Sequence, residues 1–199
     1  SRSNTSIAYN PFVSHAFLSS LEESGSATAE TGWLGHHMLL ETDDGRLVGA
    51  LPGYLKNHSR GEYVFDHGWA DAFERAGGRY YPKLQCSIPF TPATGPRLLV
   101  AEDYPRLAVQ DAMAESLKEV VRRLGVSSAH ITFVPDDEMA VLESEEYLHR
   151  TDQQFHFINK GYANHDEFLE TLASRKRKTI RKERRDALEI VDARSEGQL

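Results

Sequence analysis

Three side chains that can give or take a proton lie close together in the chain. Asp66 ends the stretch EYVFD (62–66), which has the composition of a strand, and His67 and Asp71 come after it, before a proline-rich segment. Carboxylates and imidazoles placed between a strand and a stiff loop are suited to general acid or base chemistry. We therefore take Asp66, His67 and Asp71 as candidate catalytic residues.

The proline-rich segment YYPKLQCSIPFTPATGPRLL (80–99) holds four of the eight prolines. Each proline fixes its own φ and favours extended geometry in the preceding residue, so the segment is stiff without a hydrogen-bonded ladder. Interleaved aromatic and polar groups suit a binding groove, although an ordinary surface connection has the same composition. The candidate substrate-binding residues are Tyr81, Lys83, Phe90, Thr91, Thr94 and Arg97.

The densest charge lies in SRKRKTIRKERR (174–185). Eight cations and the single anion Glu183 give residues 175–185 a net charge of +7, so the rest of this chain of net charge −7 carries −14. On a helix with about 100° per residue, seven of these cations share one half of the surface, while Lys176 lies among apolar residues. The run is either a solvated outer face or an anion site, and its purity of sign favours the anion. The candidate phosphate-binding residues are Arg175, Lys176, Lys178, Lys182 and Arg185.

Other chemistries find little support in the sequence. The single cysteine, Cys86, excludes an internal disulfide and fits a reducing cytoplasm. His36 and His37 lack companions at ligand spacing, so we expect no metal site. Neither phosphate-binding glycine motif occurs, and no apolar run is long enough to span a membrane.

Regular elements must position these residues, and hydrophobic spacing predicts their order. The turn Thr42–Gly45 predicts a hairpin, and Gly125 marks the end of the clearest helix. The predicted plan is an α/β (α+β) fold with a mixed, largely antiparallel sheet flanked by helices. Helices are expected from Pro11, over 69–78, over 103–125, after Asp136 and from Asn164, and strands over 36–41, 46–56, 62–66, 129–135 and 154–159.

Three long stretches of the chain carry a family resemblance: NPFVSHAFLSSLEESG (10–25), WADAFERAGGRYYPKLQCSIPFTPATGPRLL (69–99) and QFHFINKGYANHDEFLETLASRKRKTIRKERR (154–185). With these stretches the chain resembles the FemAB-like family of the acyl-CoA N-acyltransferase (GNAT) superfamily, proteins of peptidoglycan biosynthesis or recognition. The resemblance implies tandem GNAT-like domains. Residues 1–150 would form one such domain, and residues 151–199 a strand and the basic helix that open a second, truncated one.

The resemblance also implies a chemistry. An acyl or aminoacyl group would pass from acyl-CoA or aminoacyl-tRNA to an amine, such as that of a cell-wall peptide precursor, by direct attack. Acyl-CoA would be a co-substrate, and no covalently bound cofactor is expected. A non-catalytic recognition module for peptidoglycan precursors or peptides stays open as the alternative. If the last helix has lost a partner domain, its apolar stripe would favour a dimer.

Overall fold

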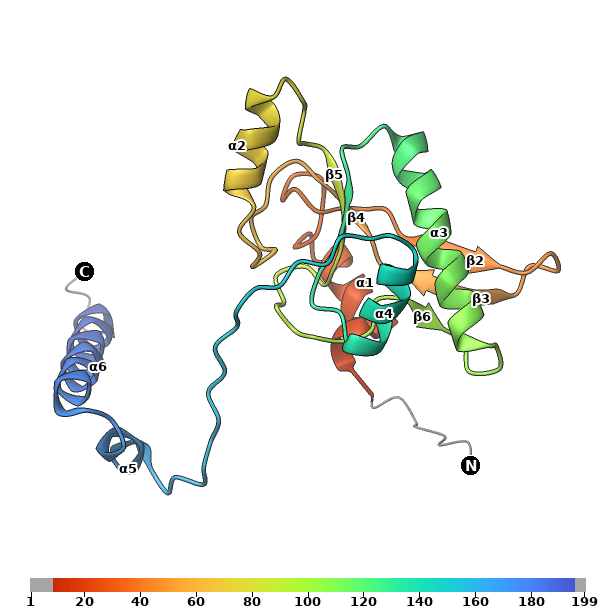
Figure 1. Cartoon of the computed structure of the whole chain (residues 1–199). Helices are drawn as coiled ribbons and strands as arrows, with labels where there is room; N and C mark the ends of the chain where they lie inside the picture. The colour runs from red at the N-terminus through yellow and green to blue at the C-terminus, as the bar shows by residue number, and fades with distance from the viewer. Residues whose placement is uncertain (1–8, 196–199) are drawn as a thin grey trace. The chain divides into compact units, whose positions relative to one another are not determined.

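The computed structural model describes residues 9–195, and the chain divides into two compact units, Ser1–Asp152 and Gln153–Leu199 (Figure 1). The first unit holds both β-sheets and most of the buried side chains. The regular elements of the second unit, as far as the structure describes it, are helices. That these units are GNAT-like domains stays a prediction.

The first unit begins with a short 3-10 helix, Pro11–Val13, and α1, His15–Glu23. Its further elements are β1 (Leu34–Gly35), β2 (Met38–Glu41), β3 (Leu47–Leu51), β4 (Tyr54–Lys56), α2 (His67–Arg75), β5 (Lys83–Cys86), β6 (Leu99–Val100), α3 (Arg106–Leu124), β7 (Ala129–Ile131) and α4 (Asp136–Ser144). The predicted α/β plan is confirmed.

Two small sheets carry the strands. One has the order β1-β4-β5-β7 and is antiparallel except for the parallel pair β5–β7, and the other is the antiparallel sheet β2-β3-β6. The predicted hairpin joins β2 and β3, and Gly45 in its turn has a φ of 80°. The expected strand 46–56 divides between the two sheets at Pro52, since proline cannot donate to a strand ladder.

The hydrophobic core lies between the sheets and α3, which ends at Gly125 with a left-handed φ of 63°. Leu84 and Cys86 of β5 enter this core, and Met113 of α3 is fully buried in it. Successive side chains of a strand point to opposite faces. Lys83 and Gln85 therefore lie on the other face of β5, although both are buried.

Two predicted strands are wrong. Residues 62–66 are irregular, because Glu62 and Asp66 turn inward toward Lys83 and Tyr63 adopts a φ of 57°, outside the β region. Residues 154–159 also lack strand structure. An alternating sequence forms a strand only where a neighbouring strand pairs with it. None of the strand pairs in residues 9–195 includes residues 154–159.

The second unit contains two helices where one was expected, α5 (His165–Glu170) and α6 (Ser174–Ser195). Asn164 caps α5 by accepting a hydrogen bond from the Glu167 amide. Thr171 donates its hydroxyl to the Phe168 carbonyl, a local bond that competes with helix continuation. The sequence predicted one helix for this region, but Phe168 and Leu169 lie on α5 and the basic run lies on α6.

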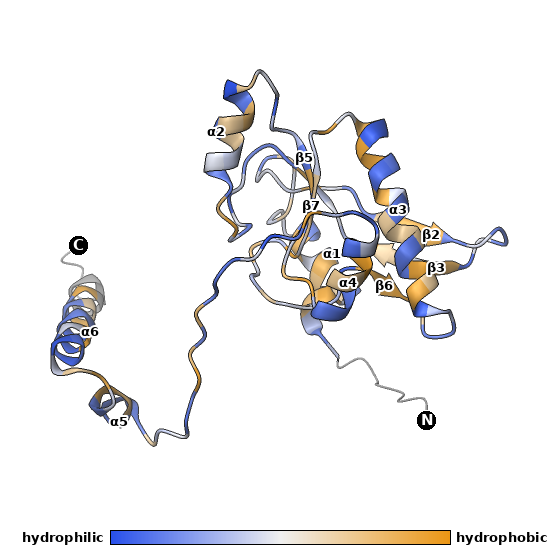
Figure 2. Ribbon diagram, in the orientation of Figure 1, coloured by the Kyte–Doolittle hydropathy of each residue, from blue (hydrophilic) through white to orange (hydrophobic). Residues whose placement is uncertain are grey.

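The helices vary in polarity, and α6 is mostly hydrophilic (Figure 2). Within residues 9–195, no helix combines the length and apolar character needed to cross a bilayer.

Candidate functional site

A buried polar surface is the most unusual feature of the first unit. The strand register places Lys56 beside Lys83, and Gln85 between Tyr54 and His130. Gln85 also donates to the Thr132 hydroxyl at 3.1 Å. We call the side chains of these residues, on the side of the sheet away from α3, the polar face: Tyr54, Lys56, Lys83, Gln85, His130 and Thr132.

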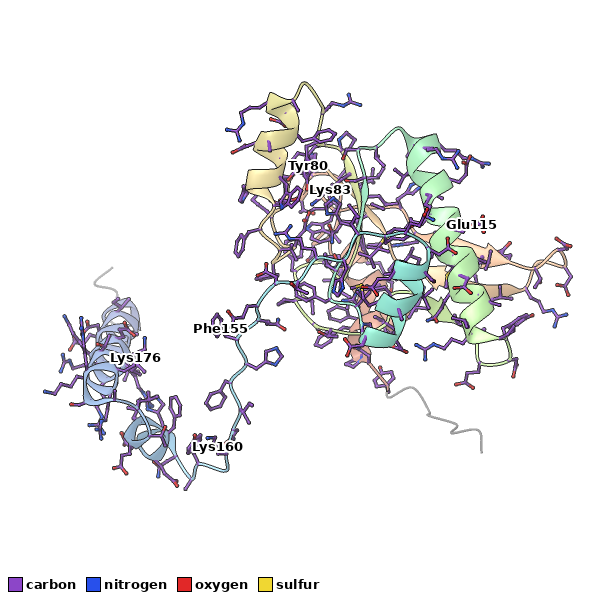
Figure 3. The ribbon with its side chains drawn as sticks, viewed as in Figure 1. Tyr80, Lys83, Glu115, Phe155, Lys160 and Lys176 are labelled. Atoms are coloured by element: carbon purple, nitrogen blue, oxygen red, sulfur yellow. The ribbon has the colours of Figure 1, made fainter. Side chains whose placement is uncertain are left out.

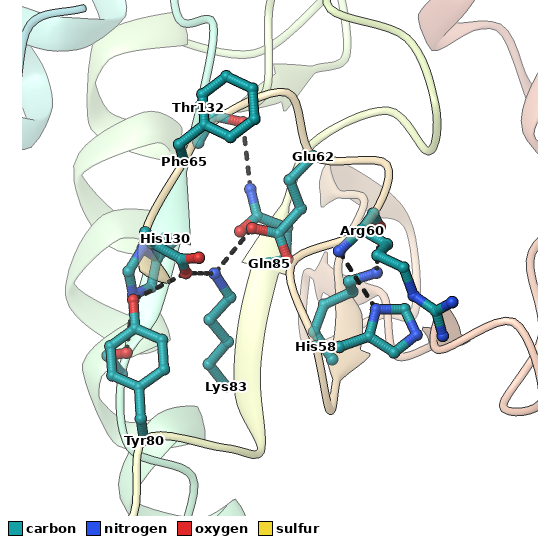
Figure 4. Close-up of polar contacts among 12 residues, drawn as sticks. His58, Arg60, Glu62, Phe65, Tyr80, Lys83, Gln85, His130 and Thr132 are labelled. Atoms are coloured by element: carbon teal, nitrogen blue, oxygen red, sulfur yellow. Dashed lines mark hydrogen bonds and ion pairs between the residues drawn. The ribbon is translucent and has the colours of Figure 1, made fainter. Parts of the chain in front are cut away.

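Residues 57–66, which we call the covering segment, lie over the polar face and supply its acids (Figure 4). The Lys83 ammonium donates to Glu62 Oε2 at 2.7 Å and to Asp66 Oδ2 at 2.5 Å. Asp66 Oδ2 also accepts from the Tyr80 hydroxyl at 2.9 Å. Figure 3 places Tyr80 and Lys83 next to each other inside the unit. One ammonium thus holds two carboxylates that water does not reach.

The two carboxyl groups differ in acidity. Burial raises the pKa of Glu62, and the neighbouring Lys83 only partly offsets this effect. Burial also raises the pKa of Asp66, but its hydrogen bonds from Lys83 and Tyr80 and the charge of Lys83 outweigh burial, so the net pKa lies below the ordinary value. Such a separation between paired acids is the usual basis for distinct proton-donor and proton-acceptor roles.

Lys56 is fully buried and lacks an ion pair within the described residues. Its Nζ donates to the Arg60 carbonyl at 3.1 Å and stands 3.6 Å from the centre of the Trp33 ring. Burial lowers the pKa of Lys56 to about 8, despite the opposing charge of Glu62. Lys56 can therefore exchange a proton near neutral pH.

His130 adds a second nitrogen base to the polar face. Burial, assisted by the charge of Lys83, lowers the pKa of His130 to about 4. Its Nε2 lies 2.9 Å from the Ser128 hydroxyl. The imidazole is consequently neutral at pH 7.

The three candidate catalytic residues lie in different surroundings. Asp66 and the candidate substrate-binding residue Lys83 meet directly in the polar cluster. His67 and Asp71 lie on α2 and are exposed, so the structure does not bring them into that cluster. Tyr81 is half-buried, with its ring centre 5.8 Å from the Lys83 ammonium.

The remaining proline-rich candidates do not form one groove with Lys83. The Phe90 ring packs on Trp33 at 5.6 Å, and Thr94 is exposed. Thr91 donates its hydroxyl to the Pro89 carbonyl within the loop. Arg97 is buried, and its guanidinium donates to the backbone carbonyls of Ala93, Gly95, Pro96 and Thr132. These bonds fasten the proline-rich loop to the residue that directly follows β7.

The basic run lies on α6, and two of its cations contact the first residues of α5. Arg181 contacts Asp166 at 3.4 Å and Arg184 contacts His165 at 2.8 Å, so both turn toward the start of α5. The candidates Arg175, Lys178, Lys182 and Arg185 are exposed and lie within about 80° of helical rotation. We call these four residues the basic stripe. Lys176, expected among apolar side chains, is also exposed (Figure 3).

Two hollows on the surface of the first unit contain no residue of the polar face. One, of about 560 Å³, is lined by Arg46, Leu47 and Tyr104 among others, and one of about 250 Å³ lies between Val13 and Leu98. No group of three or more His, Cys, Asp or Glu side chains within residues 9–195 could hold a metal ion.

Sequence reasoning missed most of the polar face, namely Tyr54, Lys56, Gln85, His130 and Thr132, and it also missed Glu62 of the covering segment. One signal was present in the sequence. In KLQCSI (83–88) polar and apolar residues alternate, which is typical of a strand with one polar face. The burial of that face depends on the covering segment, which no local pattern indicates.

Comparison with known proteins bears on the identity of this chain. Neither a curated protein nor a solved structure matches it significantly. A family model matches residues 2–194, and its description is peptidoglycan biosynthesis/recognition. This match spans nearly the whole sequence, including both the polar face and the basic stripe. The chain belongs to the FemAB-like family.

Proposed function

We propose that the chain takes part in N-acyl or aminoacyl transfer from acyl-CoA or aminoacyl-tRNA to an amine of a peptidoglycan precursor, in the cytoplasm. The observation that carries this proposal is the family match over residues 2–194. In direct transfer the amine attacks the carbonyl of the donor without an acyl-enzyme intermediate. The protein must then accept a proton from the amine and stabilise the charge that develops on the carbonyl oxygen.

The polar face supports such chemistry. Lys56, with its pKa near 8, suits the proton acceptor, because a base works best when its pKa lies near the operating pH. Glu62 and Asp66 surround Lys83 in the same cluster. His67 and Asp71 stay candidates for a reaction at the exposed side of α2.

The basic stripe supports a phosphate-containing donor. Its four cations extend over about 15 Å of helix, at a rise of 1.5 Å per residue. Arginine can grip phosphate through two parallel hydrogen bonds, and lysine adds a point charge. CoA phosphates, the diphosphate of a nucleotide-activated precursor and a tRNA acceptor stem are the ligands we propose for it. A dimer through α6 is the accompanying proposal for assembly.

The test of the proposed function is a transfer assay with the whole chain. Acetyl-CoA or aminoacyl-tRNA is incubated with a muropeptide that carries a free amine, and the products are analysed by mass spectrometry. We expect a muropeptide heavier by one acyl or aminoacyl group. A product that forms equally fast with heat-denatured protein would contradict the proposal.

A second candidate is a recognition module that binds peptidoglycan precursors without catalysis. The closure of the polar face beneath the covering segment favours it, since neither described hollow reaches the acid–base groups. Isothermal calorimetry separates the two functions. Affinity for muropeptides together with acyl-CoA supports the transferase, whereas affinity for muropeptides alone supports the module.

A further inference from the structure

The polar face retains unused hydrogen-bond acceptors next to Lys83. Within the described residues, Glu62 Oε1 and Gln85 Oε1 have no hydrogen-bond partner, and neither has Asp66 Oδ1. The side chains of Glu62 and Gln85 are deeply buried, with exposed fractions of 3% and 0%. A buried polar atom without a partner costs about 1–3 kcal/mol, and such atoms are few in native proteins. Two of them beside one ammonium indicate a ligand that donates hydrogen bonds.

The charges around Lys83 indicate the sign of the charge on that ligand. Glu62 and Asp66 share the single ammonium of Lys83, at 2.7 and 2.5 Å. Lys56, which is the other cation of the polar face, instead contacts the Arg60 carbonyl and the Trp33 ring. The second carboxylate charge is therefore not balanced by a direct ion pair. A cation with several N–H groups complements both this charge and the two free oxygens.

We propose that the polar face binds the primary ammonium group of the acyl acceptor, with Glu62 Oε1 and Gln85 Oε1 accepting two of its N–H groups. The identification of this ammonium with the acyl acceptor rests on the proposed function. The ammonium site itself rests on the two buried oxygens and their charge. In this site, Glu62 makes binding selective for primary ammonium groups over neutral or fully methylated groups.

The covering segment controls access to this site. Among the described residues, the covering segment has one backbone hydrogen bond of its own, in which the Glu62 amide donates to the Ser59 carbonyl at 3.3 Å. Side chains fasten the segment instead, through the ion pairs of Lys83 and the bond from Arg150 to the Phe65 carbonyl. Segments held by few backbone bonds open locally at low free-energy cost. The ammonium therefore enters when the covering segment lifts.

The test compares two small cations on the ¹⁵N-labelled whole chain by NMR. Methylammonium chloride and tetramethylammonium chloride are titrated at equal ionic strength, and the indole N–H of buried Trp33 and the side-chain amide of Gln85 are the reporters. We expect saturable shifts with methylammonium and none with tetramethylammonium, which has no N–H to donate. Glu62→Gln should weaken methylammonium binding at least tenfold. The control Glu74→Gln, at an exposed position of α2, should bind like the parent.

Two results would overturn the ammonium site: equal responses to both cations, or unchanged affinity in a natively folded Glu62→Gln variant. If Glu62→Gln fails to fold, Gln85→Met removes the second oxygen at similar volume, and unchanged affinity there would overturn it equally. Methylammonium binding without acyl transfer would count against the proposed function alone. Acyl transfer that bound methylammonium does not inhibit would overturn the identification of this ammonium with the acyl acceptor.

Discussion

Lys83 and Lys178 carry the same ammonium group in opposite surroundings. Lys83 is 1% exposed and contacts two buried carboxylates, whereas Lys178 projects from α6 into solvent and has no ion pair among the described residues. The fold depends on the first charge, because its removal would leave two buried anions without a counterion. The second charge contributes little to stability and stays available to a ligand. Charge density in the sequence therefore does not indicate where charge stabilises the fold.

The largest expected effect comes from removing the buried cation. Lys83→Met should destabilise the chain by about 3–5 kcal/mol at pH 7, the usual effect of leaving a buried charge without its partner. Urea unfolding measures the loss, and Lys178→Met provides the matched control with almost no change. Because the bared carboxyls would then favour protonation, the defect should shrink at pH 5. Equal free energies of unfolding for Lys83→Met and Lys178→Met would show that the buried and the exposed ammonium contribute equally to stability.

The second largest effect is the pH dependence of stability that Lys56 causes. Burial lowers the pKa of Lys56 to about 8 in the folded chain, against an ordinary value of about 10.4. Between these values the unfolded chain binds more protons, so the free energy of unfolding contributed by Lys56 should rise with pH, by roughly 2–3 kcal/mol from pH 8 to 10.4. Unfolding of the parent and of Lys56→Met, compared across this range, isolates the contribution. Parallel pH profiles would refute the prediction.

Substitutions in the basic stripe should change the affinity for phosphate ligands and leave stability nearly unchanged. Replacing Arg175, Lys178 and Arg185 together by Gln should weaken affinity for phosphate ligands at least tenfold, about 1.4 kcal/mol, while the melting temperature stays near that of the parent. The affinity of the parent should fall steeply with salt, and more for tRNA than for CoA, because more counterions are released. Binding is measured by fluorescence anisotropy. If the triple variant binds every phosphate ligand as tightly as the parent, the stripe is only a solvated face.

The smallest effect is expected where α6 meets α5. Arg181 and Asp166 lie 3.4 Å apart, but both side chains are more than half exposed. Exposed pairs of this kind contribute about 0.2–1 kcal/mol, and salt screens them. Asp166→Asn should therefore lower the melting temperature by no more than a few degrees, and high salt should abolish the difference. A loss as large as that of Lys83→Met would mean that the exposed pair is as important as the buried one.

The sequence by itself determined the features that depend on local residues. The spacing of apolar residues and Gly125 predict α3, and the turn residues around Gly45 predict the β2–β3 hairpin, because these residues satisfy backbone requirements within a few positions. The helical phase of Arg175, Lys178, Lys182 and Arg185 likewise predicts their common side. The family resemblance is also a property of sequence alone.

Only the tertiary structure decided which polar groups meet. Lys56, Lys83 and His130 come from three strands, and the covering segment adds Glu62 and Asp66 from outside the sheet. Their pairing depends on strand register and on a segment whose acids point inward while Tyr63 and Phe65 remain exposed. Local hydrophobicity predicts the opposite orientation. Here the ion pairs with Lys83, which form only after the strands have assembled, outweigh the preference of aromatic side chains for the interior.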